Sequence, residues 1–128
     1  MTEDELKDRT KHFVLRILRL VDALPHAISG RVIGGQLVRA GTSVGANYRA
    51  ACRGRSIAEF TAKLGIVVEE ADEAGYWLEL IIEGKLLPKK RVSPLLAEAN
   101  ELAAIMVASV CTARTKSKIR NQKSKIKN

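Results

Sequence analysis

The sequence has few of the residues on which catalysis, base stacking and membrane insertion commonly depend. Aromatic residues make up 4% of its 128 residues, too few rings for the stacking platform that many single-strand binders use. Its uncharged apolar runs are much shorter than a bilayer span, and the chain opens Met-Thr-Glu-Asp-Glu rather than with a basic and then apolar signal. We therefore expect a cytoplasmic protein with no membrane partner.

Cysteine and histidine are also scarce. Cys52 and Cys111 form neither a metal-ligand spacing nor a disulfide framework, so we expect two buried, reduced thiols. His12 and His26 both lack a glutamate three residues earlier, whereas a di-iron helical bundle requires Glu-x-x-His pairs. No serine has an accompanying His–Asp constellation. The sequence predicts a non-enzymatic protein with no catalytic residue, no cofactor and no metal site.

Charge is unevenly distributed along the chain. The formal net charge is +8, and the segment 112–128 carries seven Lys or Arg residues and no acid, so it supplies +7 of that total. The same segment repeats a Ser-Lys-Ile pattern with too little apolar surface to fold alone. We predict one folded domain over residues 1–113 and a basic low-complexity tail over 114–128, disordered or a frayed helix.

Apolar residues three and four apart predict helices over 4–24, 29–54, 56–84 and 93–113. Pro25 ends the first helix and Ser29 is a plausible cap for the second. Ser56 and Glu59 form a capping-box pattern before the third, and Ser93-Pro94 places proline at the first position of the fourth. No segment alternates with period two. The fold class is therefore all-α, an antiparallel up-down-up-down four-helix bundle.

Glycines line one side of the second predicted helix. Glycine inside a helix costs about 1 kcal/mol against alanine, so a row of them requires a reason. Close approach of another helix provides one, because a missing Cβ brings the two axes nearer. We predict an oligomer interface there, formed by Gly34, Gly41, Gly45 and Tyr48. The alternative is a helix broken near Gly34-Gly35 or Gly41.

Arginines occupy the side of this helix away from its apolar stripe. Between Ala23 and Ala58 there are five arginines and no acid, while the third helix is rich in glutamate. The arginines could be an ordinary solvated face. They could pair with carboxylates within a subunit or across an interface, which fixes register more than stability. They could also contact phosphates, which suit the planar guanidinium.

Several short motifs carry a family resemblance. These are Leu24-Pro25, the segments 36–40 (QLVRA) and 43–47 (SVGAN), and an Arg-Gly-Arg-Ser turn at 53–56 that leads into Glu59-Phe60 and Leu64. On these motifs the chain resembles the 23S rRNA-intervening sequence proteins over roughly residues 6–112. After Asn47 it departs from the family's common Ile-Ala-Glu-Gly pattern, so no role of that glutamate is carried over.

The resemblance implies a left-handed four-helix bundle that forms a ring-like homopentamer without enzymatic activity. The accessory variability determinant of diversity-generating retroelements, a basic pentamer that binds nucleic acid and a reverse transcriptase, is similar in fold. On family grounds we expect RNA rather than DNA as partner, bound through Arg31, Arg39, Arg49, Arg53, Arg55, Arg114, Lys116, Lys118 and Arg120. The alternatives are a scaffold that docks a reverse transcriptase, and a purely structural oligomer with a dispensable tail.

Overall fold

Four helices account for nearly the whole chain. The structure, a computed structural model, describes the backbone of residues 1–127 and the side chains of residues 1–125. Helix α1 spans Glu3–Asp22, α2 spans Ile28–Cys52, α3 spans Ile57–Glu83 and α4 spans Lys89–Lys127. Residues 1–127 contain no strand, so the all-α prediction is confirmed.

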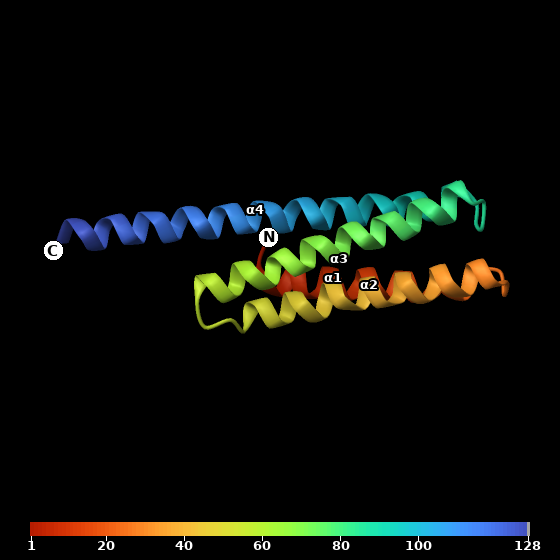
Figure 1. Cartoon of the computed structure of the whole chain (residues 1–128), viewed down its shortest axis with the longest axis horizontal. Coiled ribbons are helices and arrows are strands. Elements are labelled where there is room, and N and C mark those ends of the chain that lie inside the picture. Colours follow the sequence, from red (N-terminus) through yellow and green to blue (C-terminus); the bar gives the residue numbers. More distant parts are fainter. Residues whose placement is uncertain (128) are drawn as a thin grey trace.

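The helices form a bundle in which neighbours in sequence are neighbours in space. α1 contacts α2, α2 contacts α3, α3 contacts α4, and a smaller contact between α1 and α4 closes the circuit. Figure 1 shows that consecutive helices run in opposite directions along the long axis and that α4 continues well beyond the other three. The short loops between consecutive helices impose this alternation.

One apolar core runs along the axis of the bundle. Each helix contributes a stripe of residues three and four apart, as the spacing predicts. The largest fully buried side chains come from all four helices: Phe13, Ile17, Leu37, Val44, Leu64, Val67, Leu78, Ile81, Val92, Leu102 and Met106. These are the positions of the predicted stripes, with Val92 added before the predicted start of the fourth helix.

Two helices begin with side-chain caps. The Thr2 hydroxyl accepts a hydrogen bond from the Glu5 N–H at 3.1 Å, and the Ser56 hydroxyl accepts one from the Glu59 N–H at 3.1 Å. The Glu59 carboxylate accepts from the Arg55 N–H at 2.7 Å, one residue before the position expected in a capping box. The predicted start of α3 at Ser56 is thus confirmed, although the Glu59 carboxylate accepts from the Arg55 N–H instead of the Ser56 N–H.

The predicted cap of α2 and the predicted start of α4 are wrong. The residue before α2 is Ala27, which makes no side-chain capping bond, and Ser29 already lies inside the helix. α4 begins at Lys89 rather than at Ser93, so Pro94 lies inside the helix instead of at its first position. Pro94 is the sixth residue of α4, beyond the first turn, and because proline has no N–H it cannot donate to the Lys90 carbonyl. The Ser93 hydroxyl donates to the Lys89 carbonyl at 2.8 Å.

The glycines of α2 face α1 of the same chain. A Cβ on Gly34 would lie 3.0 Å from Val21 Cγ1, and a Cβ on Gly41 would clash with Ile17 Cδ1. Close helix approach is therefore confirmed, and α2 is unbroken, but the approaching helix is internal. The oligomer-interface prediction is wrong for Gly34 and Gly41, and for Tyr48, which is 2% exposed.

Gly45, the fourth residue of that predicted interface, is half-buried on the same side of α2. A Cβ at this position would lie 3.7 Å from the hydroxyl oxygen of Thr10 in α1, an ordinary contact distance. Gly45 therefore also faces α1 of the same chain.

The basic tail is helical. α4 runs without interruption to Lys127, so the helix continues across the boundary predicted after residue 113. The segment 114–127 is helical rather than disordered. A helix that is already nucleated in the bundle extends at low cost, since each further residue adds one hydrogen bond without a new nucleation step. We refer to residues 113–127, the last turns of α4, as the overhang. Its first turns lie beside the starts of α1 and α3, and the rest extends past them (Figure 1).

Candidate nucleic-acid interface

Four basic side chains meet where α1 begins and α2 ends. Lys7 and Lys11 of α1 and Arg49 and Arg53 of α2 line a hollow of about 220 Å³, together with the single acid Asp8. We refer to the four cations as the α1–α2 basic cluster. Arg49 and Arg53 are exposed. Such a group of cations offers converging donors to the oxygens of a phosphate group.

Helix spacing positions this cluster. Residues four apart lie about one turn apart on the same side of a helix, so Lys7 and Lys11 form one pair and Arg49 and Arg53 another. Because α1 and α2 run in opposite directions, the start of α1 lies beside the end of α2. The sequence prediction contained the two arginines but missed both lysines, whose i, i+4 spacing beside the apolar stripe of α1 was the available signal.

Arg39 is occupied within the chain. Its Nη1 lies 3.1 Å from Glu70 Oε2, its Nη2 pairs with Glu73 Oε2, and its Nε donates to Gln36 Oε1 at 3.1 Å. The hydrogen bond from Arg39 lowers the pKa of Glu73, and the same bond raises the pKa of Arg39. The phosphate role of Arg39 stays a prediction. In the structure its side chain is 47% exposed and pairs with carboxylates of α3, as the second alternative expects.

The remaining predicted arginines of this region are exposed but not all adjacent. Arg55 lies in the turn between α2 and α3, close in sequence to Arg53. Arg31 lies near the start of α2, and the 18 residues that separate it from Arg49 correspond to about 27 Å of helix. The structure therefore gathers Arg49, Arg53 and Arg55 at one end of the bundle and leaves Arg31 toward the other.

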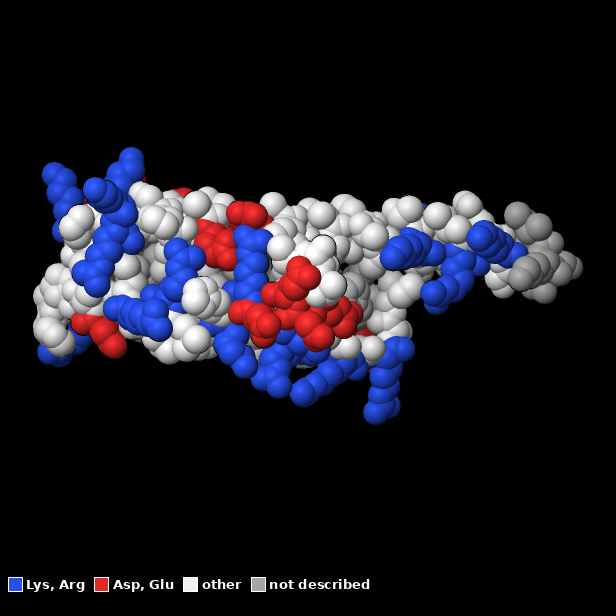
Figure 2. Space-filling view, turned by 180° about the vertical axis from the view of Figure 1, so that it is seen from behind, with Lys and Arg blue, Asp and Glu red and all other residues white. Residues whose placement is uncertain are grey.

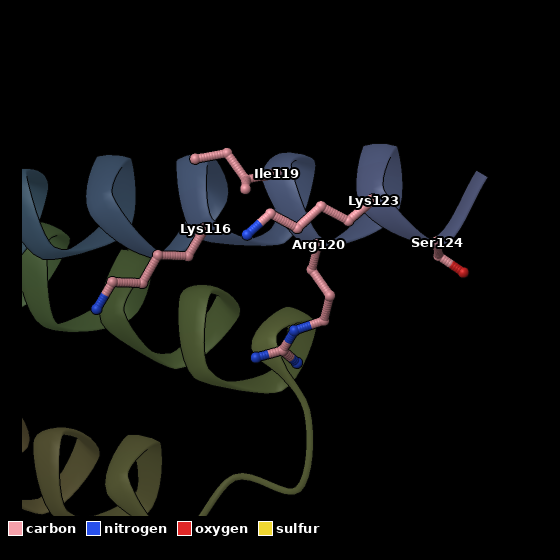
Figure 3. A pocket seen from close by; sticks show the side chains of 5 residues that line it. All are labelled: Lys116, Ile119, Arg120, Lys123 and Ser124. Atoms are coloured by element: carbon pink, nitrogen blue, oxygen red, sulfur yellow. The ribbon is translucent and has the colours of Figure 1, made fainter. Parts of the chain in front are cut away.

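The overhang carries the rest of the predicted site. Arg114, Lys116, Lys118 and Arg120 all lie on α4 and are exposed. Figure 3 shows Lys116 and Arg120 directed toward the side on which α3 begins, with Ile119 directed the other way. At 100° per residue, Arg114 and Lys118 fall together on a different side of the helix from Lys116. The overhang thus presents cations on two sides.

A further basic group was missed by the sequence analysis. Arg16 and Arg19 of α1 and Arg91 of α4 surround a shallow hollow with Leu20 and Leu95. Figure 2 shows basic side chains at the end of the bundle away from the overhang, along one edge of the body and on the overhang, with most visible acids near mid-length. On this face, basic side chains also border the acids near mid-length, and both ends of the molecule are mainly basic.

The described residues offer little for other chemistry. No group of three or more His, Cys, Asp or Glu side chains among them is arranged to hold a metal ion. Cys52 is half-buried and burial raises the pKa of its thiol, whereas Cys111 is exposed, so the prediction of two buried thiols is wrong for Cys111. Burial also raises the pKa of the Tyr48 hydroxyl above its ordinary value.

One helix is long and apolar enough to cross a membrane by length and composition. Lys89–Lys125 contains an 18-residue window of mean hydropathy 1.4, of which 22% is buried. The buried members of this helix include Leu95, Ala99, Leu102 and Met106, which pack in the core of the bundle. Core packing explains part of the apolar length of α4, and one such helix is weak evidence for a membrane span.

The sequence matches a family model over most of its length. Residues 3–108 match the model described as 23S rRNA-intervening sequence protein. The chain belongs to this family. The match is to the first of the two families that the sequence resembles, and it ends before the overhang. No curated protein matches the sequence of the chain significantly.

A solved structure has the same fold. It is the crystal structure of a protein of unknown function from the S23 ribosomal protein family of Bacteroides thetaiotaomicron VPI-5482. The sequences are 33% identical, the TM-score is 0.76, and the alignment covers 81% of this chain and 96% of that one. The relative therefore has the same bundle over almost its whole length, and the alignment covers most of this member of the 23S rRNA-intervening sequence family.

Proposed function

We propose that this protein is a non-enzymatic, cytoplasmic, oligomeric RNA-binding protein that contacts phosphates and does not read bases. The observation that carries the proposal is the α1–α2 basic cluster, in which Lys7, Lys11, Arg49 and Arg53 surround one hollow. Tyr76, the exposed aromatic residue, lies in the middle of α3 and away from this hollow. Without a nearby ring for stacking, the cluster suits backbone recognition, which is independent of sequence.

The overhang supports the same function. Arg114, Lys116, Lys118 and Arg120 stand on successive turns without an intervening acid, and side chains four apart are separated by about 6 Å of helix rise. Cations neutralise phosphates and release condensed counterions, which supplies most of the sequence-independent affinity. Arg31 and Arg55 add exposed cations to this surface.

Assembly would multiply these contacts. The family resemblance favours a left-handed bundle that forms a homopentamer, in which five basic clusters and five overhangs are held together. Linked weak sites bind a long polyanion with an effective concentration set by their spacing, so modest individual contacts produce a useful total affinity. The proposal names RNA because the family is that of 23S rRNA-intervening sequence proteins.

Fluorescence anisotropy with a labelled single-stranded RNA of mixed sequence tests the proposal. We expect binding to weaken steeply as salt rises. In a plot of the logarithm of the association constant against the logarithm of salt concentration, each phosphate contact should add about 0.7 to the magnitude of the slope. The double substitution Arg49→Gln/Arg53→Gln should lower the slope by about 1.4. The matched control is Lys63→Gln/Lys85→Gln, which removes the same charge from exposed residues outside the cluster and should leave the slope unchanged.

Two outcomes would reject the proposal. One is negligible binding by the wild-type chain at low salt. The other is an equal loss of slope in the control and in the cluster variant, because net charge alone would then explain binding. Deletion of residues 114–128 distinguishes the purely structural alternative, which predicts unchanged RNA binding, from the proposal, which predicts weaker binding.

A further inference from the structure

The overhang has a side that nothing in the described chain covers. Lys116, Ile119, Arg120, Lys123 and Ser124 line one shallow hollow along α4, and Ile119 is 47% exposed. Figure 3 shows these side chains on successive turns of α4, with Lys116 and Arg120 level with the first turns of α3 and Lys123 and Ser124 farther out. A solitary helix with an exposed isoleucine between cations is a surface suited to an acidic partner helix.

α3 presents a complementary surface. Its outward side carries Glu69, Asp72, Glu79 and Glu83, all exposed and without an ion pair among residues 1–125. At 100° per residue these four acids fall within about 80° of one another, with Tyr76 among them. The Tyr76 ring is 53% exposed. An uncompensated acidic side on a chain of net charge +8 is unsuited to a nucleic acid and suited to a basic element.

The two surfaces match in the position of their apolar residue. The acids of α3 extend over 14 residues, about 21 Å, and the bases on the docking side of the overhang, from Lys116 to Lys123, extend over 7, about 10 Å, so the overhang covers about half of the acidic side. Tyr76 lies midway between Glu69 and Glu83, and Ile119 lies near the middle of the overhang. A single apolar contact flanked by opposite charges on both sides would fix both register and orientation.

The contact cannot form within one chain. α4 already packs along α3 through its earlier turns, and the helix is continuous to Lys127, so the overhang is directed away from the middle of its own α3. An overhang that reaches an acidic side of α3 must therefore reach that of another molecule.

We propose that the overhang of one copy docks on the outward acidic side of α3 in a second copy, with Ile119 against Tyr76. The two surfaces differ, so the contact is heterologous and each copy offers one of each. Such contacts propagate head to tail until a ring closes. This inference rests on the assembly in the proposed function. Docking would occupy Lys116 and Arg120, whereas Arg114 and Lys118 lie on another side of the overhang and remain accessible to RNA.

A charge-swap experiment on the full-length chain tests the proposal. One variant carries Glu69→Lys/Glu79→Lys on α3, and the other carries Lys116→Glu/Lys123→Glu on the overhang. Sedimentation velocity at about 50 mM salt, where surface charges are weakly screened, should show an assembly for the wild type and smaller species for each variant alone. Mixed in equal amounts, the two variants should associate, because each overhang then meets an α3 surface of opposite charge in the other variant.

The control variant Glu5→Lys/Asp22→Lys makes the same change in net charge at two exposed acids of α1, and should sediment as the wild type does. Strict alternation closes only even-numbered rings, so the mixed assembly need not have the wild-type mass. Circular dichroism confirms that each variant remains helical.

Three results would overturn the proposal: a monomeric wild type, single variants that assemble normally, or a mixture no heavier than its components. RNA anisotropy on the same samples separates this outcome from the proposed function. If the sedimentation results contradict docking but the wild type still binds RNA, only the docking surface is rejected. Normal charge-swap behaviour without any RNA binding rejects only the proposed function.

Discussion

Arg9 of α1 and Glu98 of α4 form a bidentate ion pair that joins the first and last helices. Arg9 Nε lies 2.8 Å from Glu98 Oε2 and Arg9 Nη2 lies 2.6 Å from Glu98 Oε1, while the same Nη2 lies 3.0 Å from Glu101. The two side chains are 22% and 15% exposed. Because α1 and α4 share the smallest contact in the bundle, this pair fixes how the circuit of helices closes.

Replacing Arg9 by glutamine should therefore destabilise the bundle. Glu98 would keep its charge in a partly buried position without its partner, and we expect the free energy of unfolding to fall by about 1–2 kcal/mol, between the values for exposed and buried pairs. Urea denaturation measures the change. Arg19→Gln, at an exposed arginine of the same helix, should change stability by less than about 0.5 kcal/mol.

A pair of glycine substitutions separates helix propensity from packing. Gly41→Ala would place a methyl group against Ile17, which is fully buried, and should destabilise the chain by about 1–2 kcal/mol despite the better propensity of alanine. Gly35→Ala meets no atom within 4 Å and should stabilise it by up to about 1 kcal/mol. Thermal unfolding of both variants tests the difference.

The double substitution Gly41→Ala/Ile17→Val supplies the check on this mechanism. Removal of the Ile17 Cδ1 methyl should restore part of the stability that Gly41→Ala loses, since that atom is the one against which the new methyl group packs. If the double variant is less stable than the wild type by the sum of the two single losses, the contact between α1 and α2 is not the cause.

Lys85 ends α3 in the left-handed region. Its φ is 56°, its N–H donates to the Ile82 carbonyl, and the Leu86 N–H donates to the Ile81 carbonyl, which is the arrangement that usually has glycine at this position. Lys85→Gly should raise the free energy of unfolding by about 0.5–1 kcal/mol, because glycine adopts this conformation without a Cβ penalty. Lys85→Val should lower it in the same chemical denaturation assay.

The ion pair between Arg39 and Glu73 should make stability depend on pH in the acid range. The hydrogen bond from Arg39 places the folded-state pKa of Glu73 below its ordinary value near 4.5. The stabilisation is therefore present above that value and is lost as the pH falls through the lower folded-state pKa. Since both side chains are partly exposed, we expect no more than about 1 kcal/mol. Glu73→Gln should lower stability at pH 7 and match the wild type near pH 2, measured by urea denaturation at both values.

Local sequence signals predicted most of the bundle. Helix type, the stripes of buried residues and the start of α3 at Ser56 followed from spacing and capping, which act within a few residues. The start of α4 was missed because Ser93-Pro94 resembles a helix start, whereas burial of Val92 in the core extends the helix by one more turn. The straight continuation into the overhang was missed because composition describes an isolated segment, not one attached to a formed helix.

The candidate site was harder to predict because it depends on which helices are neighbours. Arg39 and Arg49 look alike on a helical wheel of α2, yet Arg39 faces the acids of α3 and Arg49 faces the lysines of α1. Similarly, the glycines indicated close approach but not whether the approaching helix was internal. Periodicity identifies the sides of a helix, and only the tertiary arrangement assigns a neighbour to each side.

None of the overhang residues 113–125, whose side chains the structure describes, belongs to the buried core of the bundle. Its sequence can therefore be exchanged for that of another charged helix at little cost in folding free energy, while any change within Phe13, Leu64 or Leu102 alters the fold itself. Binding preference and thermodynamic stability thus reside in separable parts of one continuous helix, and a chimaera that keeps residues 1–112 and replaces the rest would retarget the molecule without redesigning it.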